Sequence, residues 1–338
     1  MLCLLASATV VAAPPRALTI EPLLLEIAGP LADPRAEVSG MTWKGDTLVV
    51  LPQDPTLFAG AGQLGFFVMS RSEIIAAIDG QSDGPITPRQ VTCQAPGLSR
   101  IIKGFDGMEA MGLMGNRCYM TVEAKDDSAM AGYLVCGHYD MVNNEVVMDM
   151  TRLTAIPMGL NIPNIAEETI IIDDRQVITL SEANGRNVNP TPQGKVFDAE
   201  IGFLGTIPLP NIEYRVTDAT AVYDEKRFWV MNYYYPPEKQ KLKPAPDEEL
   251  VKFGDPGSFD PDACVERLLE LQIVRGGPDG DYIKRTNTPP VNLVTLPDRV
   301  CRNWEAVVRL GDRGFLLMTD KYPGTLLAFV PYDFTAQP

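Results

Sequence analysis

Five segments of the chain share one pattern of apolar and polar positions. Each has a short apolar run, a tight polar turn, a second apolar run and a polar residue at its end. Gly, Asn and Asp occupy the turns, and β-branched or aromatic residues occupy the runs, which is typical of β-hairpins. The five predicted hairpins are EVSGMTWKGDTLVVLPQD, EAMGLMGNRCYMTVE, EETIIIDDRQVITLSE, DATAVYDEKRFWVMN and EAVVRLGDRGFLLMTD.

Further strand-like stretches follow these hairpins along the chain. Two follow each of the first four hairpins: residues 65–70 and 86–93, 132–139 and 145–153, 195–199 and 203–207, and 265–274 and 291–296. Only residues 325–331 follow the fifth, so we expect residues 18–27 to supply the missing strand and close a ring. The pattern predicts an all-β fold, a single β-propeller of five four-stranded blades closed by an N-terminal strand. Six blades are the alternative if an outer hairpin is misread.

Helices are expected to be scarce. Residues 72–78 fit two helical turns. Residues 265–274 could form a helix, but Leu269, Leu271 and Ile273 alternate with polar residues, which favours a strand. Residues 236–262 are rich in proline and charge, which indicates a surface insertion within the fourth blade. We expect residues 14–338 to form one domain.

The first thirteen residues, MLCLLASATVVAA, are apolar and small and precede two prolines. They are typical of the hydrophobic part and cleavage site of a secretory signal, although a basic stretch before them is missing and a core strand is the alternative. The rest of the chain has no apolar run long enough to span a membrane. The sequence thus predicts a periplasmic or secreted protein without a membrane span.

The composition excludes several classes of partner and of catalytic site. The 338 residues include 44 Asp and Glu against 29 Lys and Arg, a formal net charge of −15. Such an acidic surface repels phosphate backbones and anionic lipids, so we expect no nucleic-acid or membrane-surface partner. His138 is the only histidine, which excludes a multi-histidine zinc site and leaves any Ser-His-Asp triad dependent on that residue. We expect a structural role for His138.

Each predicted hairpin carries two polar residues at its open end. Residues of an antiparallel hairpin face each other when their numbers have a constant sum. By this rule, two carboxylates, or a carboxylate and an amide, face each other at the open end of each hairpin. Like charges that face each other destabilise a strand pair by up to about 1 kcal/mol. The five pairs are Glu37 with Asp54, Glu109 with Glu123, Glu167 with Glu182, Asp218 with Asn232, and Glu305 with Asp320.

In a propeller the inner strands converge on the central channel, so these ten side chains would form a ring of oxygen ligands. Oxygen ligands rich in carboxylate select hard cations, Ca²⁺ first and Mg²⁺ second when several segments contribute. The ring therefore predicts a calcium site, with acids that face solvent or cap turns as the alternative. Glu167 and Glu168 are both acidic, and a slip of one residue would exchange which of them points inward.

Basic residues flank the same positions. Arg and Lys bind phosphate or carboxylate through charge-assisted hydrogen bonds, so these residues could hold a small anionic or ester substrate. The alternative is that they pair with neighbouring acids and neutralise the rim. The five candidates are Lys103, Arg186, Arg215, Arg302 and Lys321.

Several of these segments resemble the phytase-like β-propeller family, which is named for an esterase-like activity of phytase. They are EVSGMTW, GFDGMEAM, TDATAVYD, NWEAVVRL and GFLLMTDKYPGTLLAFVP. The resemblance implies an exported propeller that hydrolyses phosphoesters or other esters with a metal ion. In that interpretation Ca²⁺ at the channel mouth polarises the substrate and activates water, and Glu109 and Glu305 are ligands or the general base. The alternative is a non-catalytic propeller that binds a protein or ligand and holds a structural metal only.

Five cysteines follow the apolar N-terminal segment, without the CxxC spacing of metal sites. The numbers of Cys118 and Cys136 centre on Asp127 in a polar turn, so we expect the two residues to face each other on adjacent strands. In an exported protein such neighbours can form a disulfide when their Cβ atoms lie within about 4.5 Å.

Overall fold

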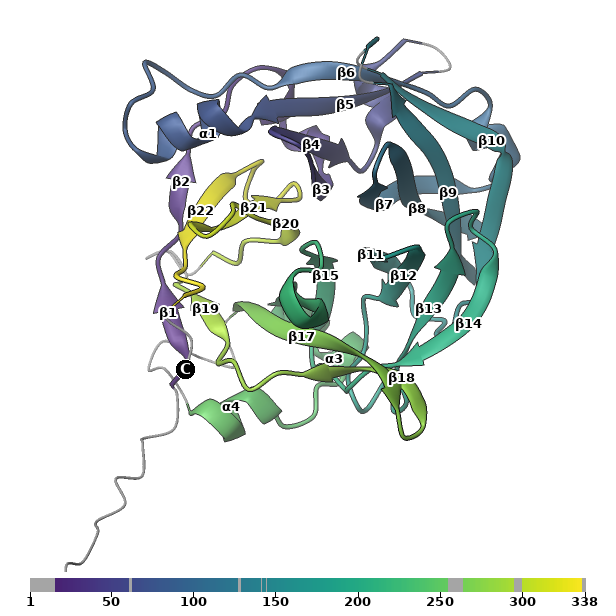
Figure 1. The fold of residues 1–338 in the computed structure, drawn as a ribbon, viewed down its shortest axis with the longest axis vertical. Coiled ribbons are helices and arrows are strands. Elements are labelled where there is room, and N and C mark those ends of the chain that lie inside the picture. Colours follow the sequence, from purple (N-terminus) through teal and green to yellow (C-terminus); the bar gives the residue numbers. More distant parts are fainter. Residues whose placement is uncertain are drawn as a thin grey trace, which may run out of the picture.

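The computed structural model describes residues 16–60, 63–126, 129–140, 142–143, 145–254, 264–294 and 300–335. The predicted signal segment, residues 1–13, lies outside these residues. The fold is mostly β, and its strands form several sheets. The described strands form four hydrogen-bonded sheets, and the parallel pairing of β6 with β10 joins two groups of four strands in the largest, so that five units follow one another along the chain. Figure 1 shows these units side by side around a common centre, with the first strand of each unit innermost.

The first three units follow the chain in simple antiparallel order. Unit one contains β3 (Val38–Lys44), β4 (Thr47–Pro52), β5 (Gln63–Ser70) and β6 (Arg89–Gln94). Unit two contains β7 (Phe105–Met114), β8 (Arg117–Asp126), β9 (Ala129–Asp140) and β10 (Glu145–Ile156), and its β10 also pairs with β6 in parallel. Unit three contains β11 (Glu167–Asp173), β12 (Gln176–Ser181), β13 (Gln193–Asp198) and β14 (Phe203–Pro208).

The last two units take up strands from the N-terminal segment. Unit four contains β15 (Arg215–Ala219), β16 (Arg227–Tyr234), β17 (Val265–Gly277), β18 (Gly280–Arg285) and β19 (Val291–Leu293), and β1 (Leu18–Ile20) pairs with β19 in parallel. Unit five contains β20 (Trp304–Arg309), β21 (Gly314–Thr319), β22 (Leu327–Pro331) and β2 (Leu23–Leu25). The antiparallel pairing of β2 with β22 confirms that the N-terminal segment completes the last unit. The sequence pattern missed β18.

Short helices connect the strands. They are η1 (Pro30–Ala32), η2 (Pro34–Ala36), η3 (Pro55–Phe58), α1 (Arg71–Ile78), α2 (Leu98–Ile101), η4 (Asp224–Lys226), η5 (Pro236–Glu238), α3 (Lys239–Leu242) and α4 (Glu248–Phe253). A capping box starts α1: the Ser70 hydroxyl accepts from the backbone N–H of Glu73, and the Glu73 carboxylate accepts from that of Ser70. Within the described ranges, no helix combines the length and apolarity that a membrane crossing requires.

Apolar side chains pack between neighbouring units. Val49 and Phe66 of unit one, for example, share a buried cluster with Met120 and Val135 of unit two. Equivalent clusters join units two and three, three and four, four and five, and five and one. Each unit is therefore covered on both faces by its neighbours. Polar side chains can be placed at the open ends of the inner strands, outside these apolar clusters.

The five innermost hairpins share one irregularity. In each of them, the register between the first and second strand shifts by one residue near the open end, which marks a β-bulge. The constant-sum rule takes no account of a bulge, so it misplaces residues on the far side of it. The bulged residues are Ser39, Glu109, Glu168, Thr217 and Glu305.

Cys118 and Cys136 do not face each other. Cys118 pairs with Gly137, and Cys136 pairs with Tyr119, so the two cysteines point to opposite faces of the sheet. The prediction is wrong by one residue because the hairpin of β8 and β9 centres half a residue later than expected, although both cysteines lie on these adjacent strands. The disulfide seen in the described structure joins Cys264 to Cys301 instead.

Candidate functional site

A polar cavity of about 260 Å³ opens at the ends of the innermost hairpins that lie opposite their turns. All five units and the insertion between β16 and β17 contribute to this acidic pocket, in which acidic residues outnumber basic ones eight to three. Its lining residues are Glu37, Val38, Ser39, Gln53, Asp106, Glu109, Glu123, Asn164, Glu168, Arg215, Glu238, Lys241, Asn303, Glu305, Asp320 and Lys321.

The β-bulges place carboxylates in the pocket. Glu109, Glu168 and Glu305 are the bulged residues of β7, β11 and β20, and each lines the cavity. Ser39 is the bulged residue of β3, and its hydroxyl donates to a backbone carbonyl of β7 at 2.6 Å. Thr217, in β15, donates in the same way to a carbonyl of β20 at 2.7 Å. The bulges thus aim three acids inward and tie neighbouring inner strands together.

Burial raises the pKa of the Glu109, Glu168 and Glu305 carboxyl groups well above their usual range. Neighbouring carboxylates raise all three pKa values further, because Glu123 acts on Glu109, Glu109 acts on Glu168, and Glu168 acts on Glu305. Burial also raises the pKa of Glu123 to about 7, and Asp106 adds to that effect. The pocket therefore keeps protons on part of its carboxyl groups at pH values at which exposed glutamates are ionised.

Glu109 and Glu305 differ in their surroundings. The side-chain amide of Gln53 donates to Glu109 at 3.2 Å, and the ion pairs among the described residues include none to this carboxyl group. Glu305 lies 3.8 Å from the Arg215 guanidinium, which lowers the pKa of Glu305 against the larger effect of burial. The pKa values of both groups stay raised, and the cation beside Glu305 makes Glu305 the more easily ionised of the two.

Arg215 compensates part of the acidic charge. Its side chain is only 13% exposed, and its guanidinium forms ion pairs with Glu182, with Glu238 at 3.7 Å and with Glu305 at 3.8 Å. These three acids come from the end of β12, from η5 and from β20. One cation at the start of β15 therefore joins two neighbouring units and the insertion.

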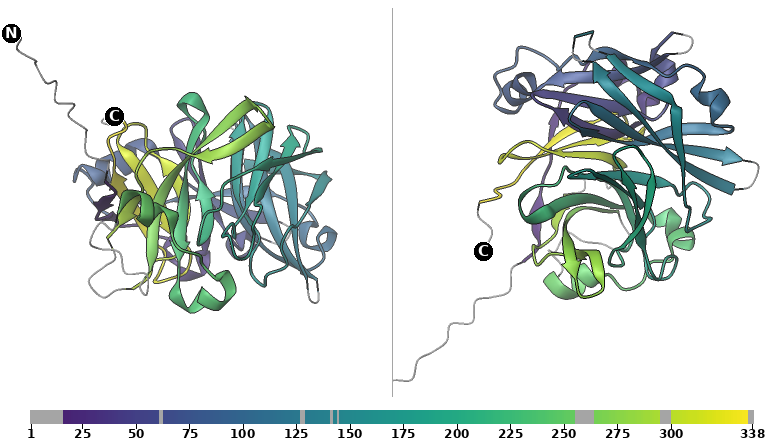
Figure 2. Two further views of the ribbon diagram at one scale, coloured as in Figure 1. Left: turned by 90° about the horizontal axis from the view of Figure 1, so that it is seen from below. Right: turned by 45° about the vertical axis from the view of Figure 1, so that its right-hand side comes forward.

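Two lysines complete the charged lining. Lys321 lies 3.1 Å from Glu37 at the rim. Lys241 of α3 donates to the Asn164 carbonyl at 2.9 Å and pairs with Glu238 at 3.3 Å. The insertion between β16 and β17 thus covers one side of the pocket, and its helices project from one face of the ring in Figure 2.

The structure brings together seven of the residues singled out in the sequence. Sequence reasoning missed Asp106, which lies at a second register shift of β7, and Glu238 and Lys241, which come from an insertion without periodicity. No spacing rule signals these three residues. The seven predicted residues that line the pocket are Glu37, Glu109, Glu123, Arg215, Glu305, Asp320 and Lys321.

Asp54 lies outside the pocket. It caps η3 by accepting a hydrogen bond from the backbone N–H of Thr56 at 3.0 Å. The bulge at Ser39 shifts the register, so that the N–H of Gln53 donates to the Glu37 carbonyl at 2.7 Å. Gln53 therefore lines the pocket in the place predicted for Asp54.

Glu167 and Glu182 are buried beside the pocket and do not line it. Glu167 pairs with Lys195 at 2.5 Å inside unit three. Glu182 forms an ion pair with Arg215. The bulge turns Glu168 inward in place of Glu167, which resolves the ambiguity between these two neighbours.

Asp218 and Asn232 bond to other parts of the fold. The Asp218 carboxylate accepts a hydrogen bond from a backbone N–H of β20 at 2.8 Å. Asn232 donates to the Arg215 carbonyl and accepts from Arg267, both at 2.8 Å. Both side chains are fully enclosed because the bulge at Thr217 shifts the register of this hairpin.

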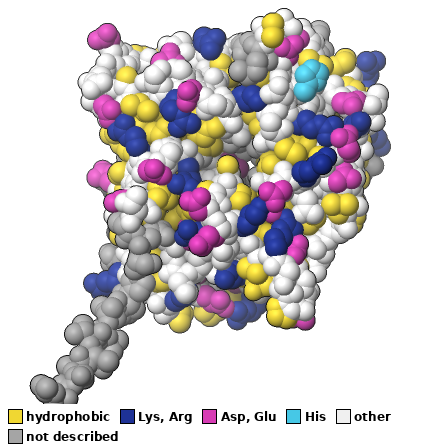
Figure 3. All heavy atoms as spheres, in the orientation of Figure 1, with side chains coloured by type: hydrophobic (Ala, Val, Ile, Leu, Met, Phe, Trp, Pro, Cys, Tyr) yellow, Lys and Arg dark blue, Asp and Glu magenta, His cyan; other side chains and the backbone are white. Residues whose placement is uncertain are grey.

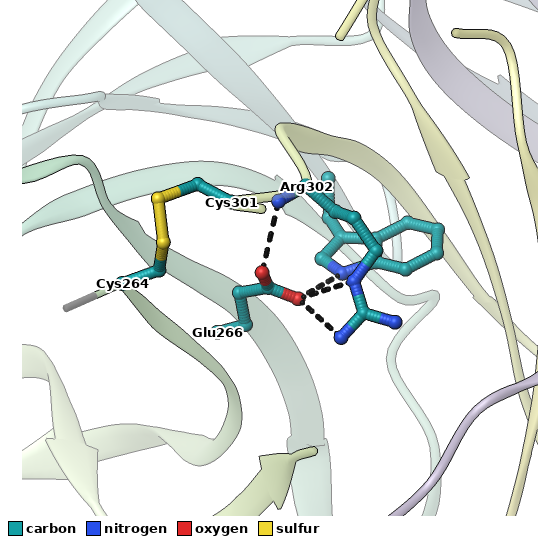
Figure 4. Close-up of a disulfide and its surroundings, with 5 residues drawn as sticks. Cys264, Glu266, Cys301 and Arg302 are labelled. Carbon is teal, nitrogen blue, oxygen red and sulfur yellow. Dashed lines mark hydrogen bonds and ion pairs between the residues drawn. A yellow bond between two sulfur atoms is a disulfide. The ribbon is translucent and has the colours of Figure 1, made fainter. Parts of the chain in front are cut away.

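Three of the five predicted substrate-binding bases lie elsewhere. Lys103 and Arg186 are exposed and do not line the pocket, and Arg186 pairs with Glu248. Arg302 is fully buried beside the disulfide (Figure 4), where its guanidinium and its backbone N–H donate to the Glu266 carboxylate at 3.0 and 2.9 Å. A sequence pattern gives no sign of this buried partner, which lies 36 positions away along the chain.

The predicted calcium ligands are divided among the pocket, a helix cap and the interior. In the part of the chain that the structure describes, no group of three His, Cys, Asp or Glu side chains is arranged to hold a metal ion. Binding of Ca²⁺ or Mg²⁺ therefore stays a prediction from the sequence.

A larger cavity, of about 810 Å³, lies beside β1, β18 and the end of β22. Its buried carboxylate, Glu270, accepts hydrogen bonds from the hydroxyl groups of Tyr223 and Thr288. On the face of the ring shown in Figure 3, acidic and basic side chains are interspersed with apolar ones. Neither region has the contrasting carboxyl groups of the acidic pocket.

No protein-family model matches the chain, and no curated protein matches it. Similar solved structures include a mutant α-L-arabinanase of Cellvibrio cellulosa (9% identity, 94% of this chain and 95% of that chain, TM-score 0.45). Others are an exo-1,5-α-L-arabinanase from a bovine ruminal metagenomic library (11%, 95% and 97%, 0.44) and a GDP-Man-dependent mannosyltransferase of Leishmania mexicana (10%, 94% and 92%, 0.45). At such identities and TM-scores these similarities carry no argument about function.

The assignment to the phytase-like family is wrong. No family model supports it, and the similar structures bear other names. The functions inferred from that resemblance are therefore withdrawn as well. They are calcium-dependent hydrolysis of phosphoesters or other esters and, as its alternative, a non-catalytic binding propeller. Four of the five segments behind it contain the bulged positions of β3, β7, β15 and β20, and the fifth covers β21 and β22. The pocket adds a physical reason, since its excess of acids repels a phosphoester.

Proposed function

We propose that the five units are the blades of a single five-bladed β-propeller closed by β2, and that the protein is exported. The ring of units, the apolar packing between all neighbours and the completion of the last unit by an N-terminal strand support the propeller. The disulfide between Cys264 and Cys301 supports export, because disulfides persist in oxidising compartments.

For the acidic pocket, the best-supported function is acid–base hydrolysis of a glycosidic bond in a small, hydroxyl-rich substrate. One observation carries this proposal: Glu109 and Glu305 line the same polar cavity, burial raises both pKa values, and a cation lies beside Glu305. Hydrolysis of an acetal needs one protonated carboxyl group and one carboxylate, and it needs no metal.

In this mechanism the protonated Glu109 gives its proton to the leaving oxygen as the bond from that oxygen to the anomeric carbon breaks. The ionised Glu305 takes a proton from the water that attacks the same carbon. Glu109 ends ionised and Glu305 ends protonated, and proton exchange with solvent resets both. Arg215 offsets part of the effect of burial on Glu305 and so favours its ionisation over that of Glu109, and the amide of Gln53 orients Glu109.

Other hydrolytic mechanisms lack their residues among those that line the pocket. The lining contains no His and no Cys, and the Ser39 hydroxyl is engaged with a backbone carbonyl. His138 is exposed on β9. Carboxylates accept hydrogen bonds from sugar hydroxyls, so a neutral or cationic polyol suits this lining better than an anion.

A panel of aryl glycosides and oligosaccharides tests the proposal through release of reducing sugar from about pH 4 to 8. We expect Glu109→Gln and Glu305→Gln each to lower kcat on an oligosaccharide by about 10²–10⁴-fold. Glu109→Gln should recover on a dinitrophenyl glycoside, whose leaving group needs no proton, whereas Glu305→Gln should not. Glu145→Gln, on the outer strand β10, is the matched control. Full activity in both pocket variants, or no hydrolysis across the panel, contradicts the proposal.

A further inference from the structure

The charges of the acidic pocket are compensated unevenly. Its three bases each pair with a pocket acid: Arg215 with Glu305 at 3.8 Å, Lys321 with Glu37 at 3.1 Å, and Lys241 with Glu238 at 3.3 Å. The ion pairs among the described residues include none to the other five pocket acids, which are Asp106, Glu109, Glu123, Glu168 and Asp320. Three of these five acids belong to unit two, and Arg215, Lys125 and Lys241 act on its Glu123 only from beyond ion-pair distance.

Backbone geometry holds Asp106 beside Glu123. The second register shift of β7 falls at Asp106, which leaves it unpaired against β8 and directed to the pocket. Gly104, at φ +75°, begins this stretch, and the carbonyl of Lys125 occupies the place that a Cβ on Gly104 would take. Only glycine permits this close approach of the two strands. The pairing of the two carboxylates is thus built into the fold.

Two carboxyl groups reach the pocket buried and without a full set of partners. Glu123 and Glu168 are each 7% exposed. One carboxylate oxygen of Glu168 makes no hydrogen bond to any described residue, and burial and neighbouring charges set the pKa of Glu123. A buried acceptor without a donor costs about 1–3 kcal/mol. The pocket therefore offers acceptors to a ligand that brings its own donors.

The same position lies next to the reacting groups. Asp106 and Glu109 belong to one strand, and Gly107 between them carries no side chain: a Cβ there would lie 2.8 Å from a carboxylate oxygen of Glu109. Glu123 pairs with Gly107 across the two strands. A sugar whose polar group contacts Asp106 and Glu123 would therefore place its ring beside Glu109.

We propose that Asp106 and Glu123 bind an ammonium group, so that the sugar hydrolysed in this pocket carries a free amino group. The inference rests on the proposed function and names its substrate class. An ammonium group brings one positive charge and three N–H donors, which match two adjacent carboxylates. Ca²⁺ takes six to eight oxygen ligands, and no three described acids are arranged for an ion. The organic cation is therefore the better match.

Calorimetric titration with three tetrasaccharides at low salt tests the inference: a glucosamine tetramer, its fully N-acetylated form and a neutral glucose tetramer. We expect the glucosamine tetramer to bind at least about tenfold more tightly than the other two. Added salt should reduce this preference, because it screens the charges. Glu123→Gln should abolish the preference, so that this variant binds the glucosamine tetramer no more tightly than the neutral tetramer, and Asp106→Asn provides a second variant should the first fail to fold. Asp54→Asn removes the same charge from a helix cap outside the pocket and should keep the preference.

Equal affinity for the three tetramers overturns the inference. Tight binding of CaCl₂ that Glu123→Gln removes also overturns it, since the carboxylates would then form a metal site. If the protein hydrolyses neutral glycosides and shows no preference for amino sugars, the ammonium site is contradicted and the proposed function is supported. A preference for the amine without hydrolysis supports the ammonium site and removes the proposed function.

Discussion

At the scale of the residue, the buried carboxyl groups of the pocket set how stability depends on pH. Burial raises the pKa of Glu109, Glu168 and Glu305 above their unfolded values, and raises that of Glu123 to about 7. A group with a raised pKa binds its proton more tightly in the folded state, so its stabilisation is complete at low pH and is lost as pH rises through the folded pKa. We expect the free energy of unfolding to fall as pH rises from about 4.5 to 7.

Urea denaturation at a series of pH values measures this slope. Glu123→Gln should flatten it up to about pH 7, because the variant has no proton to lose at that position. Glu145→Gln, outside the pocket, should leave the slope as it is in the unaltered protein. Stability that rises over this range would contradict the raised pKa values.

The sequence predicted which polar residues point toward the centre of the ring better than it predicted which residues they contact. The sequence pattern identified Glu109, Glu305 and Arg215 as inward and polar, because each stands at the end of a recognisable strand. It could not predict that Arg302 would be buried with Glu266, because a buried ion pair depends on which distant strands meet. Local spacing carries no information about that contact.

At the scale of the element, the β-bulge explains most differences between expectation and structure. The five inner hairpins are present with their turns where the pattern predicted them. Each bulge then shifts the register near the open end, so Gln53 replaces Asp54 and Glu168 replaces Glu167 in the pocket. A bulge adds one residue without changing the alternation that precedes it, and the apolar pattern therefore does not reveal it.

The bulged hydroxyls should contribute measurably to the packing of neighbouring units. Ser39 and Thr217 are buried, and each donates to a carbonyl of an adjacent unit, at 2.6 and 2.7 Å. We expect Ser39→Ala and Thr217→Val each to lower the free energy of unfolding by about 1 kcal/mol, measured in urea. The two losses should add, because the hydroxyls lie at different interfaces. The exposed Ser99→Ala is the control, and wild-type stability in both buried variants would refute this role.

At the scale of the whole molecule, the ring is joined where its two ends meet. The strand deficit of the last hairpin predicted that the N-terminal segment would pair with residues 325–331, and β2 does so. The insertion was expected between the strands of the fourth hairpin group, but its contribution of Glu238 and Lys241 to the pocket was not. An insertion without a periodic apolar pattern can be recognised in the sequence, but the pattern does not predict which part of the fold the insertion contacts.

The disulfide is a second tie between the last two units, and its removal should destabilise the whole ring. Cys264 precedes β17 of unit four, and Cys301 precedes β20 of unit five, 37 positions later. A cross-link over a loop of this length stabilises a fold by about 3–4 kcal/mol, because it restricts the unfolded chain. We expect the double variant Cys264→Ala and Cys301→Ala to lose about that much free energy of unfolding in urea, and dithiothreitol to have no further effect on it. Cys93→Ala, which removes a buried free thiol, should keep the response to dithiothreitol. If reduction leaves the unaltered protein as stable as before, the disulfide does not stabilise the junction of units four and five.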